Sequence, residues 1–440
     1  MPSILEFLRT MQSRYFERGS FLRNVATLSS GSAAANVILL ATSPLLTRLY
    51  PPDAFGVFSV FLSVFTIASV FCTLNFHVAI PLPRRDNTAA NLVIGSFAVL
   101  AVFSAVSVVL LIYPVSVLET LGVLEQIHAY SKWLPLAIFS AGANVVLYYW
   151  LLRQKDYSGL AVIKVGQSST MVGVQVALGL LSSSGFGLIV GHVVSQLAGA
   201  IAFAFRSRSK FGKIVRRTTA GRVTNALSRY REFSISYTPG YLISTLTLML
   251  PPVFLSVLFG ISSAGLYAFT TRSIRGGLSL IVQSVTRVAY VRSVELANER
   301  AYAALLQFYV KLCLRLFLLG LLPFSILLLF GPEIFALAFG EDWRDAGIIA
   351  AYMVPGLLAF MVFDHSLHVF LIADRQKLKL IWEGSRFLLM VAAFLIGYLR
   401  ALDEHQVILL LSIGQALAYG AVFFMCLGII QRMRSMATSA

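Results

Sequence analysis

The feature that most constrains this chain is a series of long apolar runs that repeats from one end of the sequence to the other. The runs are continuous, as in VILLATSPLL and LFLLGLLPFSILLLF. A helix of about 20 apolar residues crosses the ~30 Å hydrocarbon core of a bilayer. A membrane β-barrel would instead show segments of about 10 residues with alternating polarity. The pattern therefore predicts an all-α membrane protein.

The composition supports this prediction, because 58% of the 440 residues are hydrophobic and only 12% are charged. Soluble domains have about 25% charged residues, which cover their water-facing surface. This chain is therefore expected to be surrounded by the lipid bilayer. We place about twelve transmembrane helices near residues 24–47, 55–79, 91–113, 133–152, 160–181, 186–205, 233–259, 265–289, 308–330, 346–372, 381–399 and 407–429.

The basic residues indicate the orientation of these spans. Most lysines and arginines of the predicted loops lie on the side that also holds both termini. The opposite loops hold only Arg48, Lys132, Arg344 and Arg400. Because basic loops stay in the cytoplasm, both termini are predicted to be cytoplasmic, in a protein of the bacterial inner membrane. The net charge of +16 is then explained mainly by the basic cytoplasmic loops that set the orientation. We therefore expect no nucleic acid as partner.

The longest basic loop, 206–232, divides the spans into two sets of six. We divide the chain into a cytoplasmic amphipathic segment (1–22), an N-terminal six-helix lobe (23–205), the basic linker (206–232), a C-terminal six-helix lobe (233–430) and a cytoplasmic tail (431–440). The linker is expected to be solvated or bound to lipid headgroups.

The two halves show a faint repeat. Pro44 lies late in the first span and Gly56 opens the second, while Pro252 and Gly265 take the same places in the second half. Both halves enter the membrane from the cytoplasm, so the repeat is parallel. Such repeats are typical of secondary transporters that rock two lobes around a central site.

Motifs for enzyme chemistry are missing from the sequence. It contains no phosphate-binding GxxxxGK[ST] loop and no HExxH pair. Cys72, Cys313 and Cys426 lie inside apolar runs, where packing explains them. We therefore expect neither a cofactor nor a metal ion. The outward loops are short, which favours a carrier over an enzyme; a membrane-embedded polymerase or ligase remains the enzymatic alternative.

Charged residues inside the spans are the best guide to the ligand, because charge in hydrocarbon is costly and tends to face a cavity. Arg272 and Arg275 lie near the middle of span 265–289, and their spacing places both on one helix face. No acidic residue is nearby in the sequence, and the planar fork of arginine suits a phosphate. The pair predicts an anionic ligand; structural arginines bonded to backbone carbonyls are the alternative.

Asp364 and His368 form a second polar pair, in the span 346–372. They are four residues apart and would share one face of a helix. The pair would suit a proton or cation relay. The alternative interpretation is a hydrogen-bonded structural pair inside the helix bundle.

Three further sites have simple structural interpretations. Arg48 ends the first span, where its side chain can reach the outer headgroups. Lys164 lies one turn into its span and is expected to reach the cytoplasmic surface. Glu383 and Arg386 are three residues apart and are expected to pair with each other.

The stretches TSPLLTRLYPPDAFGVFSVFLS, LNFHVAIPLPRRDNTAANLV and LLLFGPEIFALAFGEDWRDAG carry a family resemblance. They resemble the polysaccharide-transport proteins, the O-antigen and exopolysaccharide flippases of the multidrug/oligosaccharidyl-lipid/polysaccharide exporter superfamily. The resemblance covers nearly the whole chain. Where relatives have a Tyr-like or Arg-like residue before AIPLP, this chain has Asn75, Phe76 and His77.

This resemblance implies two six-helix lobes around a cationic central cavity. It implies an undecaprenyl-pyrophosphate-linked glycan as substrate, moved to the periplasmic leaflet by alternating access, with a polysaccharide polymerase and a chain-length regulator as partners. It adds Arg48 to Arg272 and Arg275 as substrate-binding residues. A multidrug or organic-cation antiporter of the same superfamily is the alternative, although such a carrier would need acidic residues in its cavity to bind a cation.

Overall fold

The computed structural model describes residues 21–112, 129–215 and 218–438. Within these ranges the chain forms α-helices joined by short turns, and no β-strand occurs. The amphipathic helix predicted in segment 1–22 lies almost wholly outside the described residues. The prediction of an all-α membrane protein is confirmed.

The first lobe contains a helix within each predicted span of the first half, but the helix expected over 55–79 ends at Ser69, because turns with positive φ at Leu74 and Asn75 follow it. Its elements are α2 (Phe21–Ala41) with its short continuation α3 (Ser43–Leu49), α4 (Pro52–Ser69), η1 (Phe76–Ala79), α5 (Asp86–Ile112), α8 (Leu134–Arg153), α9 (Tyr157–Gly179) and α10 (Phe186–Val215).

The second lobe repeats this arrangement with longer helices. Its elements are α12 (Arg231–Phe259), α13 (Ile261–Asn298), α14 (Tyr302–Phe339), η2 (Glu341–Trp343), α15 (Arg344–Phe363), η3 (Asp364–Ser366), α16 (Leu367–Ile372), α17 (Gln376–Leu399) and α18 (Glu404–Thr438).

Ten segments of the described chain are long and apolar enough to cross a membrane by length and composition. Helices α9 and α13 have the length but fall outside this set, because polar residues interrupt them. These two helices carry Lys164 and the Arg272–Arg275 pair. Both of these less apolar helices therefore carry charged residues, as expected of helices that face a cavity.

The basic segment between the lobes is largely helical. Helix α10 continues to Val215, α11 (Ala220–Arg229) follows, and α12 begins at Arg231. Helix α11 packs along α5 and buries Ala226 against a cluster that includes Ala89 and Trp150. The linker thus includes a short amphipathic helix, with Arg222 and Arg229, that packs on the first lobe.

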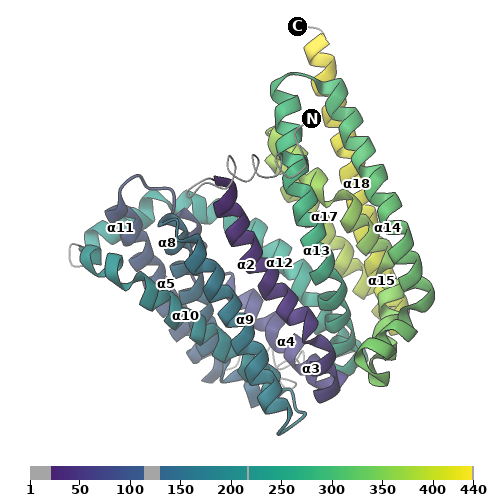
Figure 1. Cartoon of the computed structure of the whole chain (residues 1–440), viewed down its shortest axis with the longest axis horizontal. Coiled ribbons are helices and arrows are strands. Elements are labelled where there is room, and N and C mark those ends of the chain that lie inside the picture. The colour runs from purple at the N-terminus through teal and green to yellow at the C-terminus, as the bar shows by residue number, and fades with distance from the viewer. Residues whose placement is uncertain (1–20, 113–128, 216–217, 439–440) are drawn as a thin grey trace, which may run out of the picture.

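Figure 1 shows the two lobes diverging toward the end that carries the C-terminus and converging around α3. We call these the open end and the closed end. At the closed end α4 and α13 cross closely: a Cβ added to Gly56 would lie 1.9 Å from the carbonyl oxygen of Ile261, and one added to Gly265 would lie 2.0 Å from that of Pro52. The two glycines of the sequence repeat therefore meet in space, and only glycine allows the helices to approach so closely.

An aromatic cluster completes the closed end. Trp343 is fully buried and donates a hydrogen bond from Nε1 to the carbonyl oxygen of Thr47 at 3.1 Å. Its ring lies 5.0 Å from that of Phe55 on α4 and 4.3 Å from that of Phe269 on α13. The cluster seals the two lobes against each other at this end.

Candidate functional site

Helix α13 carries the two predicted site arginines about a third of the way along its length. The helix begins directly after Gly260, whose φ of 97° requires glycine for the sharp break from α12. At 1.5 Å per residue, Arg272 lies about 17 Å and Arg275 about 21 Å from that start. Both depths fall well inside a hydrocarbon core of ~30 Å.

Arg272 is directed toward the first lobe. It lies within electrostatic range of His192 on α10, whose ring packs edge-on against Phe58 and Phe65 of α4. In the part of the chain that the structure describes, no carboxylate forms an ion pair with Arg272. A half-buried guanidinium without a carboxylate is a strong attractor for an anion.

Arg275 has different surroundings, all inside the second lobe. Its guanidinium carbon lies 4.5 Å from the ring centre of Phe360 on α15, in a cation–π contact. It is also within electrostatic range of Asp364. Sequence reasoning found no acid near the pair because Asp364 is far away in the chain. The argument for an unpaired cation therefore holds for Arg272, and Arg275 is partly compensated.

Arg48 lies in the last turn of α3 at the closed end, where its side chain is exposed. Its charge is favourable there because the C-terminal end of a helix carries partial negative charge. Its neighbour Thr47 accepts the hydrogen bond of Trp343. The structure therefore does not bring Arg48 together with Arg272 and Arg275, which lie more than a helix turn deeper.

Asp364 and His368 face one cavity, but the continuous helix expected over 346–372 is interrupted. Helix α15 ends at Phe363, a 3₁₀ turn covers Asp364–Ser366, and α16 begins at Leu367. Both side chains nevertheless line a cavity of 490 Å³ between α12, α13, α16 and α17, together with Glu383, Lys379 and Tyr241. The two groups lie within electrostatic range of each other.

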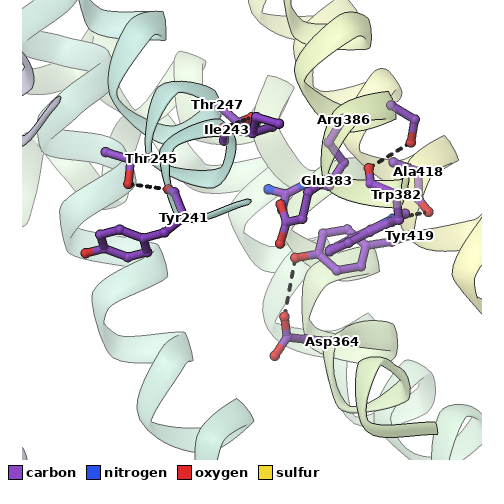
Figure 2. A network of polar contacts seen from close by, with 11 residues as sticks. Tyr241, Ile243, Thr245, Thr247, Asp364, Trp382, Glu383, Arg386, Ala418 and Tyr419 are labelled. Carbon is purple, nitrogen blue, oxygen red and sulfur yellow. Dashed lines mark hydrogen bonds and ion pairs between the residues drawn. The ribbon is translucent and has the colours of Figure 1, made fainter. Parts of the chain in front are cut away.

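The polar network behind this cavity is shown in Figure 2. Arg386 pairs with Glu383 at 3.1 Å, as the sequence predicts, and its guanidinium lies 4.7 Å from the ring centre of Trp382 and 5.5 Å from that of Tyr419. The hydroxyl of Tyr419 donates a hydrogen bond to Asp364 at 3.4 Å. Glu383 and Asp364 are thus held by a cation and a hydroxyl of the same lobe.

A second cavity, of 480 Å³, lies in the first lobe and was not anticipated from the sequence. Lys164 lines it, with its ammonium 5.5 Å from the ring centre of Tyr148. Lys164 therefore lies beside a cavity, because its face of α9 is turned toward α8 and α10, and its reach to the cytoplasmic surface stays a prediction. The signal available beforehand was the spacing of Lys164 and Gln167, which places two polar groups on one helix face.

The family of polysaccharide biosynthesis proteins has a sequence model that matches residues 45–363 of this chain. The chain belongs to this family. The match begins in the stretch around Thr47 and Arg48 and extends beyond Trp343, so it spans both partners of the closed-end hydrogen bond. A search of curated protein sequences found no match.

Solved structures similar to this family member are transporters of the MOP superfamily. An inward-facing multidrug resistance MATE family transporter is 16% identical, with 91% of this chain and 96% of that chain covered and a TM-score of 0.68. The lipid II flippase MurJ in an inward closed conformation is 14% identical, with 92% and 89% covered and a TM-score of 0.69. This family member therefore has the fold of those transporters.

The conformation can be compared in the same way. An outward-facing multidrug resistance MATE family transporter, also 16% identical, covers 93% of this chain and 96% of its own and has a TM-score of only 0.54. The lower value agrees with the closed end around Trp343 and the divergence of the lobes at the other end (Figure 1).

Proposed function

We propose that this protein is a flippase that moves an undecaprenyl-pyrophosphate-linked oligosaccharide from the cytoplasmic to the periplasmic leaflet of the inner membrane. The observation that carries the proposal is Arg272, a half-buried cation that pairs with no carboxylate of the described residues and lies within electrostatic range of His192 in the opposite lobe. Membership of the polysaccharide biosynthesis family supports a glycan as cargo.

The mechanism is alternating access. In the inward-facing state the pyrophosphate pairs with Arg272, the glycan occupies the hydrated space between the lobes, and the polyprenyl tail stays in lipid. Transport requires the closed end to separate, which breaks the hydrogen bond between Trp343 and Thr47 and the packing of Phe55 on Phe269. Arg48 lies beside this contact, so its role is to receive the anion as the site opens outward.

Charge alone supplies a driving force for this direction. The cell interior is negative, so outward movement of an anionic pyrophosphate is downhill in the membrane potential. At ~2.3 kcal/mol per charge per 100 mV, about two uncompensated charges gain roughly 4–5 kcal/mol. Coupling to protons or sodium through Asp364 and His368 is the alternative energy source.

The sidedness of the lipid-linked oligosaccharide in cells depleted of this protein tests the function directly. A membrane-impermeant glycan label is applied to spheroplasts before and after permeabilisation. We expect substrate to accumulate that is labelled only after permeabilisation. Substrate that reaches the outer leaflet normally would assign the protein to a later step, alongside the polymerase and the chain-length regulator that we propose as partners.

Arg272→Ala tests the site. Losing a charge-assisted hydrogen bond costs about 1.5–3 kcal/mol, so flipping in reconstituted vesicles should slow roughly tenfold or more. Arg272→Lys keeps the charge without the planar fork and should be intermediate. The control is Arg292→Ala, on the same helix, whose side chain is half exposed and pairs with Glu295. Equal rates in Arg272→Ala and the control would remove Arg272 from the site.

The organic-cation antiporter remains the second candidate because Asp364 and Glu383 line the cavity of the second lobe. Both carboxylates already have cations nearby, since Glu383 pairs with Arg386 and Asp364 lies within range of Arg275. This compensation leaves little negative charge for a drug. Resistance to cationic drugs on overexpression, without any defect in glycan sidedness on depletion, would favour the antiporter.

A further inference from the structure

The cavity of the first lobe has the chemistry of a ligand site. It lies between α4, α8, α9 and α10, and Tyr241 of α12 borders it from the second lobe. Tyr241 also borders the cavity of the second lobe, so the first-lobe cavity opens toward the space between the lobes. In Figure 2 the ring of Tyr241 points away from Asp364 and Glu383. The volume of 480 Å³ falls within the range of about 300–1,000 Å³ of small-molecule sites.

The walls of this cavity combine amides with tyrosine rings. Asn144, Gln167 and Gln196 supply amide donors and acceptors. Asn144 is 6% exposed; its Nδ2 donates to Gln196 at 2.7 Å, while its Oδ1 is buried without a hydrogen-bond partner. A buried acceptor of this kind is costly unless a ligand or water donates to it. Tyr148 and Tyr149 add apolar ring surface with a polar end.

Lys164 determines the charge of the cavity. The lining residues include this lysine and no carboxylate, and no ion pair of Lys164 occurs among the described residues. The cation–π contact with Tyr148 compensates only part of the charge. An ammonium group held in this way favours an anionic group on the ligand.

We propose that this cavity binds one sugar ring of the transported glycan, and that Lys164 pairs with an acidic group on that ring, such as the carboxylate of a uronic acid. The proposal rests on the proposed function and adds a specificity site to it. The pyrophosphate is a second source of anionic oxygen, but the amides and tyrosines suit a ring with many hydroxyl groups. The lysine would bind the charged group of the sugar, and the amides and tyrosines would bind its hydroxyl groups.

Saturation-transfer difference NMR on the purified full-length protein tests this site, with glucuronic acid and glucose as probes at equal concentration. We expect a signal from both sugars and a stronger one from glucuronic acid. Lys164→Met should lower the affinity for glucuronic acid about tenfold, the size of one charge-assisted hydrogen bond, and leave glucose unchanged. Lys311→Met, an exposed lysine of α14, is the control and should change neither.

A second variant tests the site in case Lys164→Met does not fold. Gln167→Leu, one turn along α9, removes an amide while keeping Lys164, so it should weaken both sugars by similar factors. Inorganic pyrophosphate, added as a competitor, should not displace either sugar. Displacement of the sugars by pyrophosphate would assign the cavity to the phosphates instead, and an unchanged preference for glucuronic acid in Lys164→Met would overturn the role of the lysine.

The flipping assay separates this inference from the proposed function. Normal flipping of lipid-linked oligosaccharide by a protein that binds neither sugar would overturn the sugar site alone. Lys164-dependent binding of glucuronic acid by a protein that moves no lipid-linked oligosaccharide would overturn the flippase proposal and keep the site.

Discussion

The two lobes hold their charges at different depths. In the first lobe the carboxylates of Asp86 and Asp156 pair with Arg153 and Arg206 at helix ends, so the interior keeps Lys164 without an acid. In the second lobe Glu383 and Asp364 lie in the interior beside cations of their own lobe.

The difference shows that the same fold can hold an interior lysine away from carboxylates in one lobe and an interior carboxylate–guanidinium pair in the other. Lys164 and Arg272 both lie where an anion between the lobes could reach them, from opposite sides. Arg386 cannot serve in the same way, because Glu383 and two aromatic rings already surround it. Removing Lys164 should therefore affect binding, whereas removing Arg386 should affect stability.

The largest effect on stability is expected for Arg386→Met. The side chains of Arg386 and Glu383 are only 5% and 12% exposed, so the variant leaves a buried carboxylate without its partner. Such changes cost about 3–5 kcal/mol, which unfolding in detergent micelles would measure.

The double variant Glu383→Gln/Arg386→Met removes both charges and should regain most of this loss. Lys164→Met serves as the matched comparison in the first lobe and should leave the free energy of unfolding nearly unchanged. If Lys164→Met destabilised the protein as much as Arg386→Met, Lys164 would also be part of a stabilising charge pair, and this difference between the lobes would be lost.

A smaller effect is expected for Asp364→Asn, measured as flipping in vesicles with a controlled membrane potential. If the potential drives transport, the variant keeps an oxygen that accepts the hydrogen bond from Tyr419 and loses only the negative charge beside Arg275 and His368, so the rate should stay within about threefold. Dissipating the potential should abolish flipping in both proteins. Flipping that continues on a proton or sodium gradient alone, and is lost in Asp364→Asn, would instead assign ion coupling to Asp364 and His368.

Much of this architecture follows from the sequence, because membrane spans depend on local composition. Each predicted span contains a helix, although those over 55–79 and 346–372 are interrupted, and the pairing of Glu383 with Arg386 follows from helical spacing. The faint repeat of Gly56 and Gly265 also has a physical basis, since the two residues meet where the lobes cross.

The remaining features depend on contacts between distant segments. The interruption of the helix at Asp364 could not be predicted, because no proline or glycine lies at that position. The proximity of Asp364 to Arg275, and the turning of Lys164 into a cavity, depend on how α15 and α9 are rotated in their bundles. A single sequence gives the spacing of residues on a helix face, but it does not say which neighbour that face meets.

The smallest effect is expected for Asp156→Asn, at the open end of the first lobe. Asp156 caps α9 through the backbone N–H of Gly159 at 3.2 Å and accepts a hydrogen bond from Arg206 at 2.9 Å. The Arg206 guanidinium lowers the pKa of this carboxyl below its usual range, so the pair stabilises the fold above the unfolded-state pKa of about 3.9 and is lost as the pH falls through the lowered folded-state value.

Because both groups are partly exposed, Asp156→Asn should cost under ~1 kcal/mol at neutral pH. The difference in unfolding free energy between the variant and the natural protein should stay constant from pH 7 to about pH 5, because the carboxyl is ionised in both states over that range. It should shrink in about 1 M salt, where the Debye length is ~3 Å. A loss as large as that of Arg386→Met, insensitive to salt, would mean that the first lobe also depends on a buried charge pair.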